Sequence, residues 1–207
     1  MNFFKSLLKS KENPKTGALF GSTEYELKNM LCGIGDSEIF ESTIKISNYP
    51  FEPSSVYPEK EISANEINSI CTDSYPPLIK VKDEVIFISR EYFEDLKNFR
   101  ERNKIPPFEA TRNWDWLLEP YLDTEYTEQT DKRLNDLLSK NGILKDEIDS
   151  IRNEVRDQMY KYNFDTMLWD WGGLGLADVL AAMRVKYNKA QFAEFYKRAM
   201  EIEVRTK

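Results

Sequence analysis

Apolar residues recur at steps of three and four along the second half of the chain, which is the spacing of amphipathic α-helices. The longest such stripe predicts a helix of about five turns and consists of Leu144, Ile148, Ile151, Val155, Met159 and Tyr162. Similar stripes predict a helix around Leu134 that Asn141-Gly142 ends, a helix over 176–187, and a last helix that Asn188 caps. Because the connections between these segments are short, we expect neighbouring helices to pack antiparallel.

The first half of the chain contains the strand patterns. Apolar and polar residues alternate over 43–47, and this alternation predicts a β-strand. Two further apolar runs, 78–82 and 85–88, predict a β-hairpin that turns at Asp83-Glu84.

Two helices in the first half are predicted from the spacing of a capping box. Thr23 precedes Glu26 by three residues, and the helix that begins there is expected to end at Gly33. The same spacing at residues 63 and 66 predicts a short helix that ends near Cys71.

These elements predict an α+β fold that is predominantly helical, with a small β-hairpin or sheet packed on an antiparallel helical assembly. The length favours one domain over residues 1–207, with a mixed α+β part at 1–110 and a helical part at 111–207. Residues 1–9 have an apolar side that lysines interrupt, so they fit a short docking helix better than a secretory signal. No apolar run approaches the roughly 18 residues needed to cross a bilayer, and we expect a cytoplasmic protein without a membrane span.

The charge of the chain narrows the possible classes of function. With 29 Lys and Arg against 36 Asp and Glu, the net charge is −7 and the pI is about 4.9, which disfavours a nucleic-acid partner. The chain has no histidine, so Ser-His-Asp and Cys-His catalytic sites and His-containing zinc sites are excluded. Cys32 and Cys71 cannot build a four-ligand zinc site alone, and we expect two reduced, packed thiols. The sequence therefore predicts no cofactor and no metal site.

The tripeptide Trp-Asp-Trp occurs at 114–116 and again at 169–171. If residues 113–123 form a helix, one arc must face the core, and that arc consists of Trp114, Leu117, Leu118 and Tyr121. Trp116 would then point outward beside carboxylates. An exposed tryptophan within an acidic patch suits the anchor of a protein interface.

Residues 115–131 carry six acids and no base, namely Asp115, Glu119, Asp123, Glu125, Glu128 and Asp131. With no cation nearby in the sequence, these carboxylates are expected to be available to a basic partner. The predicted partner-binding surface consists of Trp116, Asp115, Glu119, Asp123 and Glu125.

A structural interpretation of the same residues stays open. Near a helix start, the macrodipole stabilises acids such as Asp115 by about 0.3 to 1 kcal/mol. Pro120 is expected to kink or shorten the helix and so to turn Trp116 inward. The face would then be a solvated acidic surface over a buried tryptophan.

The glycine-rich run 172–175 is expected to separate two helices. It is not a dinucleotide-binding loop, because it lacks the preceding strand and the third glycine of that motif. Asp165, Asp170 and Asp178 flank the run without the spacing of a calcium-binding loop. A metal site there is a remote alternative.

The leading functional hypothesis is a soluble, non-enzymatic binding protein whose acidic surface engages a basic protein partner. An immunity-type inhibitor that covers the active site of a cationic toxin or nuclease is its most concrete form. The alternative is a hydrolase that uses paired carboxylates without histidine, acting on a glycan. A third hypothesis is a scaffold subunit whose apolar helix faces complete an oligomer.

Overall fold

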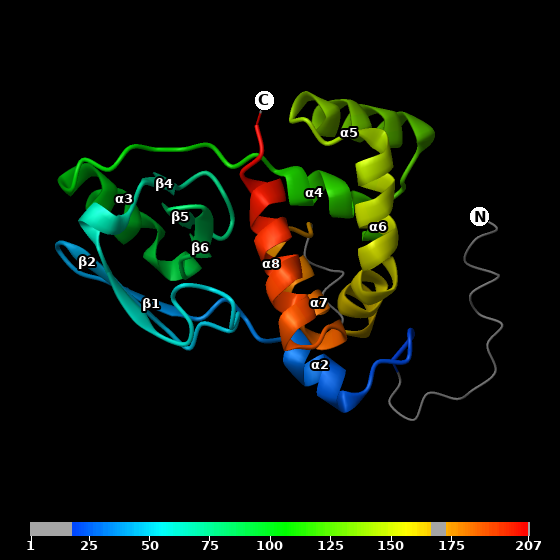
Figure 1. Cartoon of the computed structure of the whole chain (residues 1–207), viewed down its shortest axis with the longest axis horizontal. Helices are drawn as coiled ribbons and strands as arrows, with labels where there is room; N and C mark the ends of the chain where they lie inside the picture. Colours follow the sequence, from blue (N-terminus) through cyan, green and yellow to red (C-terminus); the bar gives the residue numbers. More distant parts are fainter. Residues whose placement is uncertain (1–17, 167–172, 207) are drawn as a thin grey trace.

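The chain forms a β part and a helical part that lie side by side, with α8 along the boundary between them (Figure 1). The structure is a computed structural model, and it describes residues 18–166 and 173–206. The predicted α+β, predominantly helical fold is confirmed. The expected docking helix over 1–9 and the second Trp-Asp-Trp at 169–171 lie outside the described residues.

The β part contains two antiparallel sheets of three strands each, in the orders β1-β2-β3 and β4-β5-β6. Their strands are β1 (Asp36–Ile39), β2 (Thr43–Ser47), β3 (Lys60–Ser63), β4 (Ser69–Cys71), β5 (Leu78–Val81) and β6 (Glu84–Phe87). The predicted strand over 43–47 is β2, and its Ile44 and Ile46 are fully buried. The predicted hairpin is β5-β6, but Glu84 pairs with Val81, so the turn lies one residue earlier than expected.

The helix predicted between Ser63 and Cys71 is wrong. The capping box forms, but it holds only the 3-10 turn η1 (Ala64–Glu66). Beyond it the backbone N–H of Asn68 donates to Lys80 O at 2.8 Å, and β4 then pairs with β5. Pairing with a neighbouring strand here outweighs the local preference for a helix.

The other predicted helices are confirmed, except that the one expected over 113–123 is shorter, and a 3-10 turn η2 (Arg90–Tyr92) and a π-helical turn η4 (Lys161–Asp165) flank two helices. The α-helices are α2 (Glu24–Met30), α3 (Phe93–Arg102), α4 (Asn113–Leu118), α5 (Glu128–Lys140), α6 (Lys145–Tyr160), α7 (Leu176–Lys186) and α8 (Lys189–Glu203). Thr23 and Asn188 form the predicted caps of α2 and α8. Successive helices from α5 to α8 pack on one another and enclose most of the buried apolar side chains of this part.

The segment before α2 is fastened to the π-helical turn. The carboxylate of Asp165 accepts the backbone N–H groups of Phe20 and Ser22 at 2.7 and 2.9 Å. The ring of Phe20 stacks on Tyr160 with centroids 5.5 Å apart. Because α2 also packs on α7, the described chain starts at residue 18 in the helical part, crosses to the β part and returns at α4 (Figure 1).

Residues just before and within α4 cap the carboxyl end of α8, whose last carbonyls have no partner within the helix. Trp114 Nε1 donates to Ala199 O at 3.0 Å, and the wholly buried Asn113 donates to Ile202 O at 2.7 Å. The hydroxyl of Thr111 donates to the carbonyl of Glu203. The start of α4 is therefore held in place by the end of α8.

Aromatic and ionic contacts join the β part to α8. The hydroxyl of Tyr196 donates to the carboxylate of Glu84 at 2.6 Å, and the Tyr196 and Phe51 rings lie 6.3 Å apart. At the amino end of α8, the side chain of Lys189 pairs with the carboxylate of Glu52 at 2.6 Å. These contacts give the predicted packing of the sheet region against the helical assembly.

Candidate partner-binding surface

Pro120 ends the helix that carries the predicted surface. α4 stops at Leu118, and a 3-10 turn, η3 (Glu119–Tyr121), follows it. Proline has no N–H to donate to the carbonyl of Trp116, and its ring would clash with that carbonyl in a continuing α-helix. The prediction of one helix over 113–123 is therefore wrong, and the shortening expected from Pro120 is what the structure shows.

The guanidinium of Arg152, on α6, binds the carbonyls left free at this end of α4. Its Nη2 donates to Trp116 O and its Nε to Leu117 O, each at 3.2 Å. Its Nη1 donates to the carboxylate of Asp131 at 2.9 Å, and the arginine side chain is only 12% exposed. One part-buried cation therefore joins α4, α5 and α6 to one another.

Two of the six acids between residues 115 and 131 are neutralised within the chain, which corrects the expectation that all are free. Asp115 pairs with Arg112 at 3.0 Å, and Asp131 pairs with Arg152. Partial burial raises the pKa of Asp131, but hydrogen bonds from Tyr126 and Arg152 outweigh it and leave that pKa below its ordinary value. Asp131 is therefore a structural carboxylate.

Trp116 lies between the two predicted orientations. It is part-buried and packs against the hydrophobic core, so only part of the indole remains at the surface. The arc predicted to face the core does so, since Trp114, Leu117, Leu118 and Tyr121 are all buried.

The remaining acids form a surface without internal neutralisation. Asp123, Glu125 and Glu128 are exposed and Glu119 is part-exposed. Within residues 18–166 and 173–206, none of these four side chains takes part in an ion pair or a side-chain hydrogen bond. We call Glu119, Asp123, Glu125 and Glu128 the acidic patch. It includes three of the predicted site residues, and the other two, Asp115 and Trp116, are on α4, which precedes η3.

Glu203 is a buried acid that the sequence prediction missed. It is 8% exposed, and its Oε2 has no hydrogen-bond partner. Burial, together with the nearby charge of Asp115, raises its pKa to about 8, although the backbone N–H of Trp114 opposes the shift. Its position four residues after Ala199 continues the apolar stripe of α8, and that spacing was the available signal.

Asp115 and Glu203 are also the pair to consider for the hydrolase alternative. Burial raises the pKa of Asp115 despite its contact with Arg112, so both acids have raised pKa values. A glycosidase, however, needs two carboxyls that face a substrate cleft. Glu203 is enclosed at the end of α8, so this pair gives the hydrolase no support.

The acids near the glycine-rich run are occupied by protein donors. Asp178 accepts the hydroxyl of Tyr162 and the backbone N–H of Gly175, both at 2.8 Å, at the start of α7. Asp165 holds the segment before α2, and Asp170 lies outside the described residues. Across the described ranges, no group of three or more Cys, Asp or Glu side chains is arranged to hold a metal ion.

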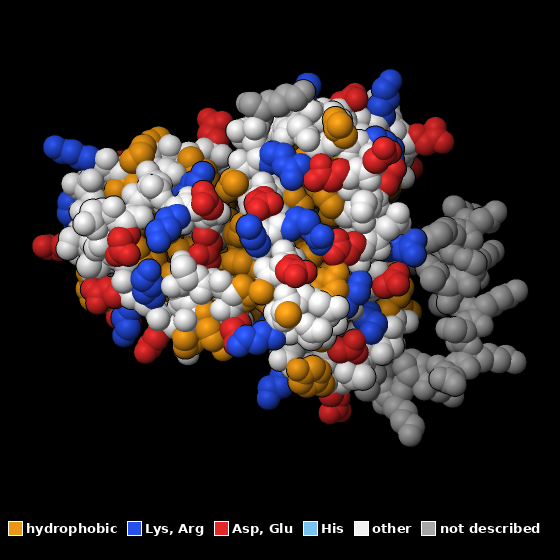
Figure 2. Space-filling model, in the orientation of Figure 1, with side chains coloured by type: hydrophobic (Ala, Val, Ile, Leu, Met, Phe, Trp, Pro, Cys, Tyr) orange, Lys and Arg blue, Asp and Glu red, His pale blue; other side chains and the backbone are white. Residues whose placement is uncertain are grey.

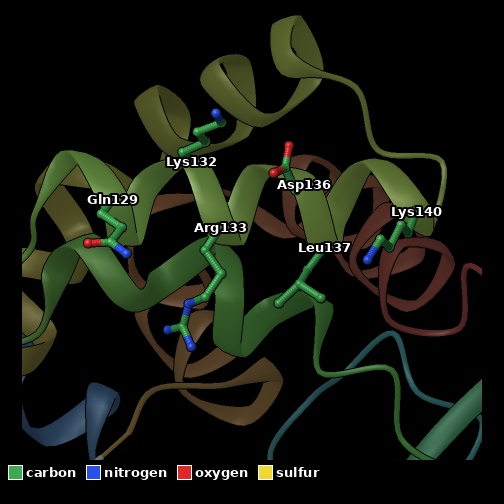
Figure 3. Close-up of a pocket in the computed structure, with 6 residues that line it drawn as sticks. All are labelled: Gln129, Lys132, Arg133, Asp136, Leu137 and Lys140. Atoms are coloured by element: carbon green, nitrogen blue, oxygen red, sulfur yellow. The ribbon is translucent and has the colours of Figure 1, made fainter.

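A shallow and largely open hollow runs along the outer side of α5. Figure 3 shows Lys132 and Asp136 on one edge of the helix and Arg133 and Leu137 on the other. Six residues line it, all from this helix: Gln129, Lys132, Arg133, Asp136, Leu137 and Lys140. We call these six residues the stripe of α5. The sequence prediction considered only the apolar positions of this helix and missed the stripe.

On the face seen in Figure 2, basic and acidic side chains are interspersed and do not gather into one large region of either sign. Both cysteines are free thiols, and Cys71 is buried. Among the described helices, none has the length and apolar character that a membrane crossing requires.

No family model matches the chain, and neither the curated proteins nor the solved structures include one that is significantly similar to it.

Proposed function

We propose that this chain is a non-enzymatic binding protein whose acidic patch engages a basic protein partner. Its most concrete form is an immunity-type inhibitor of a cationic toxin or nuclease. The observation that supports the proposal is the set of four carboxylates from η3 to the first residue of α5, none of which forms an ion pair with a described residue. Complementary charge of this kind accelerates encounter and selects among partners.

The position of the patch between two fixed helices also favours binding. Arg152 ties α4 to α5, so the intervening turn, 119–127, is held at both ends. A surface that is already ordered loses little conformational entropy when a partner binds. The part-exposed indole of Trp116 offers an apolar contact at its edge.

We also propose that the protein acts in the cytoplasm. Two unbridged cysteines are compatible with a reducing compartment. Fractionation of the source cells with an antibody to the chain tests this location, and recovery in a membrane or extracellular fraction would contradict it.

The test of function is affinity capture from the source organism, followed by binding measurements on the purified partner. The patch variant combines Asp123→Asn, Glu125→Gln and Glu128→Gln. The matched control removes three exposed acids of the β part, by Glu59→Gln, Glu61→Gln and Glu101→Gln. We expect a partner with a basic surface, bound about tenfold more weakly by the patch variant because exposed ion pairs contribute a few-fold each.

The outcome against the proposal is equally specific. Equal affinity of the patch variant and the control variant would remove the patch from the interface. Capture of a partner that lacks a basic surface, with affinity insensitive to salt, would contradict the electrostatic basis.

A further inference from the structure

The outer side of α5 carries three cations that form no ion pair with the described residues. Lys132, Arg133 and Lys140 line the hollow on this helix, and Asp136 is the one acid among its lining residues (Figure 3). Among the described residues, none of these four side chains makes an ion pair or a hydrogen bond. The stripe is thus net positive on a chain whose net charge is −7.

Two further acids of α5 form no ion pair with the stripe. Glu128, at the first position of the helix, lies one turn before Lys132 without pairing with it, and Asp131 is bound to Arg152, Tyr126 and Asn135. The cationic stripe thus begins where the acidic patch ends, and each surface has its own residues to substitute.

The stripe is also firmly supported and partly apolar. Leu134 and Leu138, on the opposite side of α5, are buried, so the helix is anchored to the core. Leu137 is part-exposed within the hollow, and the lysine side chains add methylene groups beside it. From residue 129 to residue 140 the stripe runs for roughly 16 Å.

We propose that this stripe is a docking site for an acidic segment of a partner protein, in which carboxylates flank an apolar side chain that packs on Leu137. Charge complementarity selects this occupant. A second copy packed symmetrically, stripe against stripe, would bring two positive surfaces face to face. A nucleic acid needs a wider basic footprint than one helix of an acidic chain offers.

The test uses a fluorescein-labelled synthetic peptide of roughly twelve residues, which spans the stripe when helical, with leucine at every third position and glutamate elsewhere. Fluorescence anisotropy measures its binding to the full chain. The stripe variant combines Lys132→Gln, Arg133→Gln and Lys140→Gln. The matched control removes two lysines and one arginine elsewhere, by Lys28→Gln, Lys97→Gln and Arg102→Gln.

We expect salt-sensitive binding that is about tenfold weaker in the stripe variant and unchanged in the control, since three exposed ion pairs contribute a few-fold each. Replacing the leucines of the peptide by serine should weaken its binding to the natural chain. In the variant Leu137→Ser, the leucine peptide and the serine peptide should bind with equal affinity. The variant of the acidic patch should bind the peptide as the natural chain does.

Three results would overturn the proposal. The first is no detectable binding of the peptide, and the second is equal binding by the stripe variant and the control variant. The third is tighter binding of a single-stranded oligonucleotide than of the peptide, which would assign the stripe to nucleic acid. None of these results bears on the acidic patch, whose partner is tested separately.

Discussion

Replacing Glu203 by glutamine removes an ionisable group that is enclosed where α8 ends, beside Asp115. Burial raises the pKa of Glu203 from its ordinary value of 4.5 to about 8 in the folded protein. The folded state therefore holds this proton more tightly than the unfolded state does. Well below pH 4.5 the carboxyl is neutral in both states, so its ionisation does not affect the free energy of unfolding.

Between pH 4.5 and about 8 the unfolded chain loses the proton while the folded chain keeps it, so the free energy of unfolding falls as the pH rises. Each unit of pKa difference corresponds to about 1.4 kcal/mol, so the loss over this range is on the order of 3 to 5 kcal/mol. This pH range is well suited to the measurement, because the chain has no histidine that would titrate within it. Apart from the α-amino group, no group of ordinary pKa titrates between about pH 5.5 and 8.

In Glu203→Gln the contribution of Glu203 to this pH dependence should disappear, whereas the contributions of Asp115 and Asp178, whose pKa values burial also raises, remain. The new amide cannot ionise, but an amide nitrogen at the position of Oε2 finds no acceptor, which costs roughly 1 to 3 kcal/mol at every pH. The variant should therefore be less stable than the natural protein at pH 5 and more stable at pH 9.

Urea unfolding followed by tryptophan fluorescence, at unit steps from pH 5 to 9, measures both curves. Glu201→Gln, an exposed substitution on the same helix, is the control and should leave the slope unchanged. Parallel curves for Glu203→Gln and the natural protein would refute the reasoning, as would a variant that is less stable at every pH.

Three substitutions test the other structural arguments. Arg152→Met removes the hydrogen bonds to Trp116 O and Leu117 O and leaves Asp131 without its cation, so urea unfolding should show a loss of about 3 kcal/mol. Asp131→Asn in the same chain should recover part of that loss, and a fully additive double variant would contradict the pairing. Trp116→Ala should lose about 2 kcal/mol in the same measurement, because the part-buried indole packs on the core; an unchanged midpoint would place the ring outside it. Asp165→Asn should accelerate hydrogen exchange about tenfold at the amides before α2, with a smaller effect on global unfolding, and unchanged exchange would show that this carboxylate does not hold the segment.

Helices were predictable where the apolar stripe was long and the caps were strong. α6 and α8 were predicted because their packing depends on a repeated spacing within one segment. β4 was mistaken for the end of a helix, because its partner is a strand several residues further along the chain. Local capping at Ser63 carries no information about that partner.

In the candidate surface, too, local features were predictable from the sequence and long-range contacts were not. The sequence placed Asp123 and Glu125 in an acid-rich stretch, where the structure leaves both exposed, and it indicated that Pro120 could shorten the helix, which it does. It had no means of placing Arg152 across the end of α4, because that contact joins residues 35 and 36 positions apart. The pairing of Asp131 and the part-burial of Trp116 follow from this long-range packing.

The packing of α2 on α7 determines the order in which the two parts can assemble during synthesis. Strands β1 to β6 and α3 form one uninterrupted stretch of chain, so this region can acquire its structure as soon as it leaves the ribosome. α2 leaves earlier but must wait until Leu176 and the residues after it have been made. The helical part is thus completed only when α7 and α8 have been made, although α2, the first of the described helices, leaves the ribosome long before them. A nascent chain stalled before α7 would carry an ordered β part beside an unfinished helical one.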